Sequence, residues 1–285
     1  MSRATLIGFS AILLWSVLAL LTKATEPVPP FLLNTLTFAV GGSIGMIWVL
    51  RNGGLTRLRG VSWRVYAFGT AGLFGYHALY FSALRLAPAA EAGLISYLWP
   101  LLIVLLSGLL PGERLRAGHI IGAVMGFGGA VLIVGGGSAG YDPTYLPGYA
   151  LAFGCALTWA GYSVISRRLG AAPTDTVAVF CLATAALSLP LHLIFEPTIW
   201  PASSAGWLAV LALGAGPVGV AFYTWDIGVK QGDIQMLGIA SYAAPLLSTL
   251  ALVAAGLARP TGSLALAALL ITLGAGIAAG ASLRR

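Results

Sequence analysis

Hydrophobic and polar positions follow one another along this chain in long blocks, with apolar stretches of about 20 residues separated by short polar connections. An α-helix rises about 1.5 Å per residue, so a stretch of that length matches the roughly 30 Å hydrocarbon core of a bilayer. The pattern predicts ten membrane-spanning helices, at residues 4–25, 30–50, 63–86, 90–110, 117–136, 146–167, 174–195, 205–229, 234–257 and 262–282.

The composition excludes an ordinary soluble domain. The chain has 285 residues, of which 59% are hydrophobic and 8% charged, and its mean hydropathy is +0.94. Soluble domains carry about 25% charged residues. We therefore predict an all-α integral membrane protein. Cys155 and Cys181 fall inside apolar stretches, so we interpret them as small hydrophobic residues and not as a disulfide.

The net charge of +7 could indicate binding to nucleic acid, but its distribution favours another explanation. If the N-terminus is cytoplasmic, the cytoplasmic connections receive Arg3, Arg51, Arg57, Arg59, Arg64, Arg114, Arg116, Arg167, Arg168, Lys230, Arg284 and Arg285. The opposite connections receive only Lys23, Arg85 and Arg259. This excess is the positive-inside bias of membrane proteins. We expect a multi-pass protein of the bacterial inner membrane with both termini in the cytoplasm, membrane lipids as partners and no nucleic acid.

The sequence contains an internal repeat. An offset of 145 residues matches the pairs Gly93/Gly238, Ser96/Ser241, Tyr97/Tyr242, Pro100/Pro245, Leu101/Leu246, Leu102/Leu247 and Leu105/Leu250. We predict a first five-helix repeat over residues 1–140 and a second over 141–285. Because five is odd, the second repeat enters the membrane inverted. Inverted repeats place substrate sites near the membrane midplane, beside discontinuous helices.

Two prolines lie within predicted spans at matched positions, Pro100 and Pro245, each three residues after a tyrosine. Proline removes a backbone hydrogen bond and kinks or breaks a helix. We predict broken helices here and interpret both prolines as gating hinges. The alternative, that they only shape the helices for packing, stays open.

Aromatic residues fall into two groups. Trp48, Trp63, Trp200 and Trp207 lie near span ends, as interfacial residues do. Trp15, Trp99 and Trp159 lie well inside their spans, where lipid tails offer the indole N–H no acceptor. We therefore expect the second group to face the bundle interior around a partly wet cavity for an aromatic or apolar solute. The alternative is tight aromatic packing without a ligand.

Few ionisable residues lie inside the predicted spans. His77 is near the centre of one, which suggests substrate contact or proton handling, or else a neutral imidazole bonded to a neighbour. Asp226 lies near the cytoplasmic end of the eighth span with Lys230 four residues later, so a local ion pair is the favoured interpretation. Neither pattern indicates a central fixed charge for a phosphate or an organic cation.

Catalytic motifs are matched only by chance. Residues 41–45 read G-x-S-x-G and residues 214–219 read G-x-G-x-x-G, but neither follows a β-strand. The glycines at 41 and 45, at 118, 122 and 126, and at 276 and 280 are better explained by close helix packing. With no metal-ligand cluster in the sequence, we predict no catalytic residues, no metal and no cofactor.

Several motifs together carry a resemblance. They are Trp15-Ser16 followed by Lys23, then Pro29-Pro30-Phe31-Leu32-Leu33, Ala83-Leu84-Arg85-Leu86-Ala87-Pro88, Tyr97-x-x-Pro100, and Leu110-Pro111-Gly112-Glu113-Arg114. The chain resembles the EamA-type drug/metabolite transporters over essentially its whole length. The resemblance implies ten helices in two inverted halves around a central cavity, lined mainly by the first, third, fourth, sixth, eighth and ninth.

Within that superfamily the chain is most similar to the aromatic amino acid exporters. Two departures stand out: Leu36-Thr37-Phe38 occupies the place where many members carry an arginine, and residues 257–260 lack the Gly-Glu that follows Pro111 in the first repeat. From the aromatic pattern and the resemblance together, the predicted substrate-binding residues are Trp15, Tyr76, His77, Tyr80, Tyr97, Trp99, Trp159, Tyr162, Ser163, Tyr223 and Tyr242.

The sequence therefore predicts a secondary transporter, not an enzyme. We expect a monomer that exports aromatic or other large neutral amino acids by alternating access. Two alternatives stay open: an exporter of other small metabolites or amphiphilic drugs, and an intramembrane enzyme built around His77.

Overall fold

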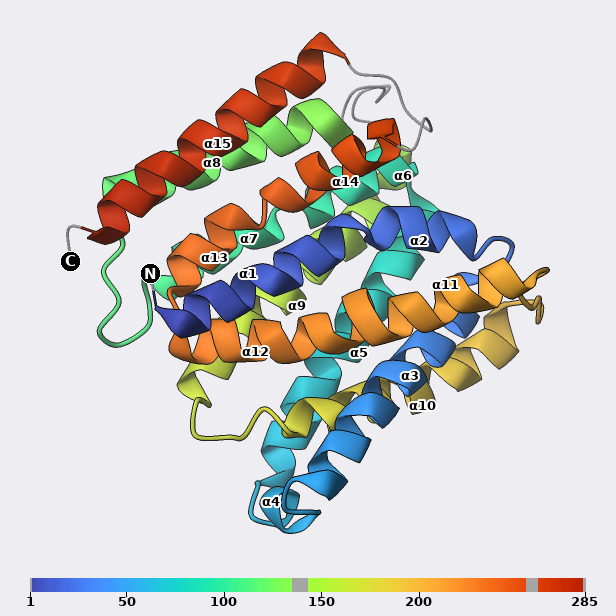
Figure 1. The fold of residues 1–285 in the computed structure, drawn as a ribbon. Coiled ribbons are helices and arrows are strands. Elements are labelled where there is room, and N and C mark those ends of the chain that lie inside the picture. The colour runs from blue at the N-terminus through green and yellow to red at the C-terminus, as the bar shows by residue number, and fades with distance from the viewer. Residues whose placement is uncertain (1, 135–142, 255–260, 284–285) are drawn as a thin grey trace.

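The computed structural model describes residues 2–134, 143–254 and 261–283. Within these ranges the chain consists of helices and loops, with no β-strand (Figure 1). The prediction of an all-α protein is confirmed. The principal helices are α1 (Arg3–Ser16), α2 (Leu18–Ala24), α3 (Pro30–Arg51), α5 (Trp63–Leu86), α6 (Ala89–Ser96), α7 (Trp99–Ser107), α8 (Ala117–Val134), α9 (Leu146–Arg168), α10 (Thr176–Phe195), α11 (Ser204–Ala215), α12 (Ala221–Gln231), α13 (Ile234–Ala240), α14 (Ala243–Ala254) and α15 (Gly262–Leu283).

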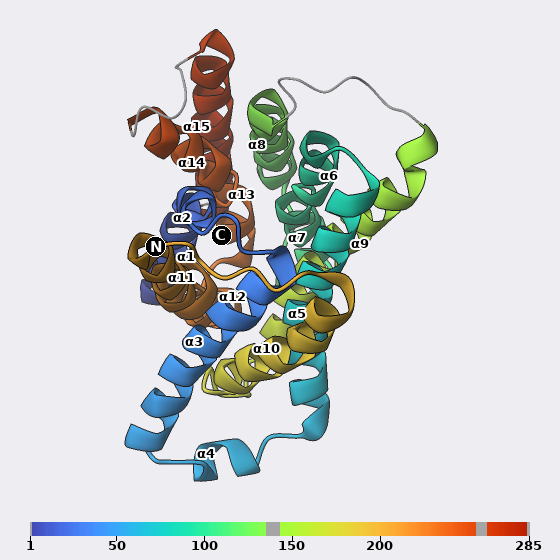
Figure 2. The ribbon, with the colours of Figure 1, turned by 90° about the vertical axis from the view of Figure 1, so that its right-hand side faces the viewer.

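Short helices connect some of the long ones. The helix α4 (Thr56–Arg59) joins α3 to α5, as Figure 2 shows, and the 3₁₀ turn η1 (Pro143–Tyr145) precedes α9. One π-helical turn, η2 (Gly216–Val220), joins α11 to α12.

Seven segments within the described ranges are long and apolar enough to cross a membrane. They are Arg3–Ala24, Pro30–Arg51, Pro143–Arg168, Thr176–Phe195, Ser204–Gln231, Ile234–Ala251 and Gly262–Ser282. The apolar helices Glu91–Ser107 and Ala117–Leu132 are shorter. The prediction of ten membrane-spanning helices therefore stays a prediction.

Two helices are broken where the sequence predicts it. The first break separates α6 from α7 at residues 97–98, and the second separates α13 from α14 at residues 241–242. Pro100 and Pro245 then lie in the first turn of the following helix, where a missing N–H costs no helical hydrogen bond. The break between α1 and α2 at Val17 and the π turn η2 are not predicted by the sequence analysis.

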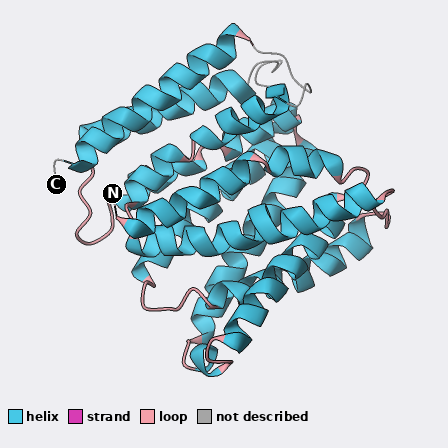
Figure 3. Cartoon of the chain, viewed as in Figure 1, coloured by secondary structure: helices cyan, strands magenta, loops and turns pink. Residues whose placement is uncertain are grey.

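The most extensive helix packings join the two predicted halves of the chain. These pairs are α8 with α15, α3 with α10, α5 with α9, and α1 with α12. Figures 1 and 2 both show α8 beside α15. Figure 3 shows the same bundle coloured by secondary structure. Glycines permit the close approach. A Cβ on Gly122 would lie 2.5 Å from the Gly274 carbonyl oxygen, and one on Gly228 would lie 2.6 Å from the Gly8 Cα. The two halves are therefore interlocked.

The predicted small-residue motifs differ in use. A Cβ at Gly41 would lie 2.8 Å from the Gly219 Cα, so the close helix packing expected for this glycine is present and lies within the chain. A Cβ at Gly276 or Gly280 would meet no atom within 4 Å among the described residues. The four tryptophans expected near the membrane interfaces are exposed, at 62% for Trp48 and 72% for Trp63.

Candidate substrate site

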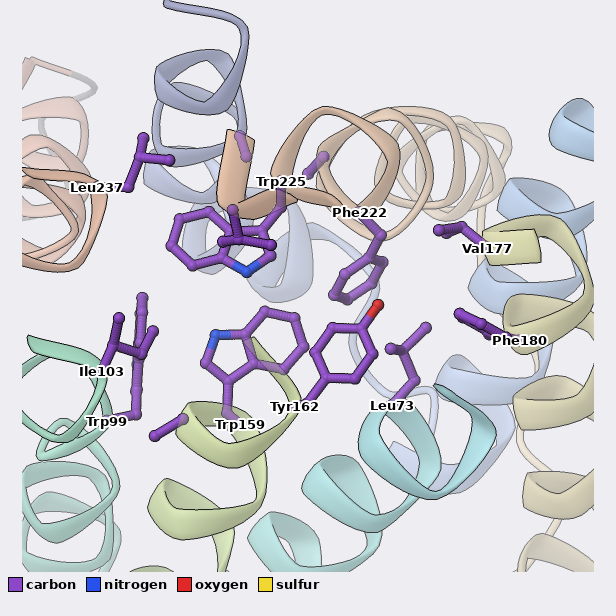
Figure 4. Packing of buried hydrophobic residues seen from close by; sticks show 14 of the residues in the cluster. Leu73, Trp99, Ile103, Trp159, Tyr162, Val177, Phe180, Phe222, Trp225 and Leu237 are labelled. Atoms are coloured by element: carbon purple, nitrogen blue, oxygen red, sulfur yellow. The ribbon is translucent and has the colours of Figure 1, made fainter. Parts of the chain in front are cut away.

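Four tryptophan side chains meet in the middle of the bundle. Trp15 comes from α1, Trp99 from the start of α7, Trp159 from α9 and Trp225 from α12. All six pairs of indoles have ring centroids between 5.1 and 6.3 Å apart. Figure 4 shows three of them converging from separate helices. We call these four residues the tryptophan cluster.

The indoles of the tryptophan cluster meet mostly edge to face. Trp99 is nearly perpendicular to the other three, with interplanar angles of 85°, 88° and 86°. Aromatic rings prefer such arrangements because the positive ring edge meets the negative face. These four indoles lie where the partly wet cavity is expected, and the cavity itself stays a prediction.

Two indole N–H groups of the tryptophan cluster have buried acceptors. Trp15 Nε1 donates to the Pro217 carbonyl oxygen at 3.0 Å, within the π turn η2. Trp225 Nε1 donates to Ser163 Oγ at 3.1 Å, and both of these side chains are fully buried. Turns of π-helix often occur at functional sites. The bond from Trp15 to Pro217 connects one such turn, η2, to the tryptophan cluster. Ser163 positions Trp225 by this bond.

A second aromatic layer lies against the tryptophan cluster. Phe38 stacks on Phe222 at 5.5 Å, and Phe222 contacts Trp159 at 5.6 Å. The His77 ring meets Phe38 edge to face at 4.9 Å. Its Nδ1 lies 2.8 Å from the Leu73 carbonyl oxygen, which can only accept, so Nδ1 carries the proton and Nε2 is the basic nitrogen.

Tyrosine hydroxyls lie along one side of the tryptophan cluster. Tyr76 and Tyr80 are stacked one helical turn apart at 6.2 Å, and Tyr76 contacts Trp159 at 5.5 Å. Tyr97, in the break between α6 and α7, lies in the neighbourhood of Tyr80. These three tyrosines are only partly buried, whereas Trp159 is 4% exposed. They therefore place hydrogen-bonding groups beside an apolar aromatic core.

Tyr162 contacts the same core from α9. Its ring stacks on Trp159 at 5.2 Å and on Phe68 at 5.7 Å. The hydroxyl is buried beside Ser166 of the same helix and makes no well-formed hydrogen bond. In Figure 4 it points past the ring of Phe222.

Two predicted site residues lie elsewhere. The Tyr223 hydroxyl donates to the Gly41 carbonyl oxygen at 3.1 Å and so joins α12 to α3. The Tyr242 hydroxyl accepts from the Leu101 backbone N–H at 3.0 Å, and its ring belongs to a separate apolar cluster with Ala130. The structure does not bring these tyrosines to the tryptophan cluster, and their contact with substrate stays a prediction.

Three members of the site are missing from the sequence prediction. Trp225 lies four residues from the end of its predicted span, where tryptophans normally mark the interface. Phe38 is notable in the sequence only because it belongs to the stretch where many members of the superfamily carry an arginine. Phe222 shares a helix face with Asp226 at a spacing of four, which predicts its inward position but does not assign it to the substrate site.

One end of the bundle is tied by a buried carboxylate. Glu196, whose side chain is 2% exposed, accepts from the Phe31 and Leu32 backbone N–H groups at the start of α3. It also pairs with Arg85 at 3.2 Å and with His192 at 3.0 Å. A carboxylate at a helix N-terminus compensates the positive end of the helix dipole. We call this the Glu196 end.

The other end of the bundle lies where α9 ends and α10 begins. We call it the Arg167 end. Arg167 pairs with Glu113 at 2.5 Å and donates to the Val229 and Gly232 carbonyl oxygens at 2.9 and 2.7 Å. A cavity of about 660 Å³ opens here. Its lining consists of Leu110, Pro111, Arg167, Arg168 and Lys230.

The predicted ion pair between Asp226 and Lys230 is present at 2.8 Å. Its setting differs from the expected interface, because the two side chains are only 1% and 4% exposed. The Thr174 hydroxyl donates to the same carboxylate at 2.7 Å, and Lys230 also donates to the Ala172 carbonyl oxygen at 3.0 Å. The pair is therefore buried at the Arg167 end, where Lys230 also contributes to the lining of the cavity.

Apolar helices long enough to cross a bilayer, an uncharged aromatic centre and charged networks at both ends together define a helical membrane transporter. The chain belongs to the EamA-like transporter family, whose sequence model matches residues 2–135 and again residues 146–279. The family consists of transporters and not of enzymes, so the prediction of a non-enzyme is confirmed.

Several relatives of the chain have a named function. The chain is 60% identical over 280 residues to the aromatic amino acid exporter YddG of Ancylobacter novellus, covering 97% of each chain. It is 28% identical to the exporter of the same name in Escherichia coli, covering 90% of each. A crystal structure of a protein that is 60% identical superposes with a TM-score of 0.93 over 97% of each chain.

Proposed function

We propose that this chain exports aromatic and other large neutral amino acids across the bacterial inner membrane by alternating access. The observation that carries the proposal is the tryptophan cluster with partly buried tyrosine residues beside it. The 60% identity to a named aromatic amino acid exporter supports it.

The chemistry of the site suits a large neutral zwitterion. The aromatic ring of a substrate can take the place of one indole in these ring contacts. Aromatic pairs contribute about 0.5 to 1.5 kcal/mol beyond the burial of apolar area. The hydroxyls of Tyr76, Tyr80 and Tyr97 and the Nε2 atom of His77 offer hydrogen bonds to the ammonium and carboxylate groups. A multivalent anion would instead require fixed positive charge near the centre.

We further propose ten membrane-spanning helices in two inverted repeats, residues 1–140 and 141–285. The family model matches twice, over segments separated by 144 residues (146 − 2). Exchanging the halves also converts the packing of α5 with α9 into that of α12 with α1, and leaves the pairs α3 with α10 and α8 with α15 unchanged. This pattern supports a two-fold relation between the repeats.

The proposed topology places both termini and the Arg167 end in the cytoplasm. Contacts join segments expected on the same side: Arg57 pairs with Asp175 at 2.8 Å, and Arg116 donates to the Ala281 carbonyl oxygen at 3.1 Å. The exposed interfacial tryptophans support contact with membrane lipids. Since both halves of one chain supply the tryptophan cluster, we propose that a monomer is the working unit.

Alternating access requires the two ends to open in turn. We propose that α6–α7 and α13–α14 bend at their breaks near Pro100 and Pro245. The network of Glu196 would then open toward the periplasm, and that of Arg167 toward the cytoplasm. Each network is held together by hydrogen bonds between charged groups. When its end opens, water can form hydrogen bonds to these groups in place of their partners.

Counterflow into proteoliposomes loaded with unlabelled tryptophan tests this function. Labelled tryptophan should accumulate transiently, and excess phenylalanine should abolish the accumulation, whereas glutamate and a quaternary ammonium cation should leave it within about twofold. Competition by the cation but not by phenylalanine would overturn the substrate class and favour the exporter of amphiphilic drugs. Liposomes without protein provide the baseline.

A further inference from the structure

Asp226 is a buried acid that the proposed substrate site does not use. It lies on α12 directly after Trp225, and its side chain is 1% exposed. Its Oδ2 atom pairs with Lys230 at 2.8 Å and accepts from the Thr174 hydroxyl at 2.7 Å. Its Oδ1 atom is buried without a hydrogen-bond partner. An unsatisfied buried carboxylate oxygen is costly, so it marks a functional candidate.

A second unsatisfied group lies beside this carboxylate. The Tyr162 hydroxyl is buried, makes no well-formed hydrogen bond although Ser166 lies beside it, and is close enough for the charge of Asp226 to act on it. A hydroxyl can donate the hydrogen bond that the Oδ1 atom lacks. The ring that bears this hydroxyl stacks on Trp159 at 5.2 Å. The tryptophan cluster and the buried acid are therefore joined by one side chain.

The other polar groups around Asp226 are already engaged. Lys230 also donates to the Ala172 carbonyl oxygen at 3.0 Å. On α10, the Cys181 thiol lies beside Tyr162 and is buried. The further polar and charged groups on the elements around α12 include Ser166 of α9 beside the Tyr162 hydroxyl, Asp175 paired with Arg57, Arg167 paired with Glu113, the exposed Arg3 of α1, and Asp233 and Gln235 of α13.

We propose that Asp226 is the proton-binding site that couples export of the amino acid to proton entry. This rests on the proposed function. A substrate ring that enters the tryptophan cluster displaces Trp159 and brings the Tyr162 hydroxyl onto Oδ1. That hydrogen bond stabilises the carboxylate and disfavours its protonated form. By linkage, a proton on Asp226 disfavours the substrate-bound arrangement to the same extent.

The proton balance follows from the contacts. The carboxylate and the Lys230 ammonium form a neutral pair when no proton is bound. Binding of one proton converts the carboxylate to a carboxylic acid and leaves the ammonium on the Ala172 carbonyl, so the site gains one positive charge. The site then holds either the proton or the substrate, and the cycle exchanges one for the other.

Proteoliposomes loaded with labelled tryptophan test the proposal. An acidic external buffer should speed tryptophan efflux by the wild type about fivefold or more, the lower range of typical coupling. A trapped pH dye should report proton entry that depends on tryptophan. Asp226→Asn should retain measurable exchange of labelled for unlabelled tryptophan and lose both responses. Asp175→Asn, which changes another buried, ion-paired acid at the Arg167 end, should keep them.

Tyr162→Phe keeps the stacked ring, removes the hydroxyl and gives a second readout if Asp226→Asn does not fold. It should reduce the response to the pH gradient by a larger factor than it changes the exchange of labelled for unlabelled tryptophan. A wild type that exchanges tryptophan but responds to no pH gradient, or to a sodium gradient instead, would overturn proton coupling and leave the proposed function intact. A full response in folded Asp226→Asn would also overturn it. A wild type that exchanges no tryptophan would instead contradict the proposed function.

Discussion

The two broken helices have the same sequence motif, Ser-Tyr-x-x-Pro, but different surroundings. At the first break Trp99 joins the tryptophan cluster, and Tyr97 keeps accessible surface beside Tyr80. At the second break Ala244 takes the place of Trp99, and Tyr242 is fully buried. The tyrosine that is accessible in one half is thus a packed core residue in the other.

The buried tyrosine of the second break supports the first. In an uninterrupted helix the Leu101 N–H would bond to the carbonyl of Tyr97. In this structure it bonds to the Tyr242 hydroxyl at 3.0 Å. An open backbone donor at one break is therefore satisfied by a side chain from the other. The repeated motif has one copy that presents an aromatic residue to the proposed substrate site and one that stabilises the opened helix.

Replacing Tyr242 should have the largest effect on stability. Tyr242→Ala leaves a cavity and an unsatisfied N–H, and loss of a buried aromatic ring costs about 3 to 5 kcal/mol. Tyr242→Phe should cost about 1 to 3 kcal/mol, because only the acceptor is lost. Thermal unfolding in detergent measures both. Tyr97→Phe is the matched variant in the other half; an equal loss of stability there would remove the asymmetry.

Gly126→Ala should disturb the same contact less severely. A Cβ at this position would lie 2.4 Å from the ring of Tyr242, so the ring must shift. Overpacking of this kind costs about 1 to 3 kcal/mol. Gly128→Ala, two residues further along α8, meets no atom within 4 Å and is the control. Equal melting temperatures for the two variants would show that the position of Tyr242 is not critical.

Pro100→Ala should change kinetics more than affinity. Restoring a helical hydrogen-bond donor beside the first break disfavours bending there, and a tenfold slower exchange corresponds to about 1.4 kcal/mol in the barrier. The concentration of tryptophan for half-maximal binding should change by less than about twofold on that account. Pro245→Ala should slow exchange less. Weakened binding with an unchanged exchange rate would contradict the hinge role.

The sequence predicts the features that depend on local chemistry. Matched prolines predict where the helices break, and tryptophans inside long apolar stretches predict a buried aromatic centre, because lipid gives the indole N–H no partner. The spacing of Asp226 and Lys230 predicts their ion pair. Each of these depends on residues close together in the chain.

Features that depend on which helix lies opposite are not predictable in this way. Helical periodicity places Tyr223 on a face but cannot show that the facing neighbour is Gly41 of α3. Trp225 lies near a predicted span end, yet it is buried because α12 continues to Gln231 and packs on α1. The role of Tyr242 as an acceptor for Leu101 requires knowing that the two broken helices are in contact.

Because the first break presents Trp99 to the proposed substrate site and the second has Ala244 in its place, we expect the first break to give the site its aromatic selectivity. Substituting Trp99 tests this most directly. The measurement is the ratio of counterflow rates for labelled tryptophan and labelled leucine in the wild type, in Trp99→Leu and in Ala244→Val. Trp99→Leu should lower this ratio about tenfold, within the range that contacts in one pocket supply, while Ala244→Val should change it less than twofold. An unchanged ratio in Trp99→Leu, or an equal fall in both variants, would contradict the claim.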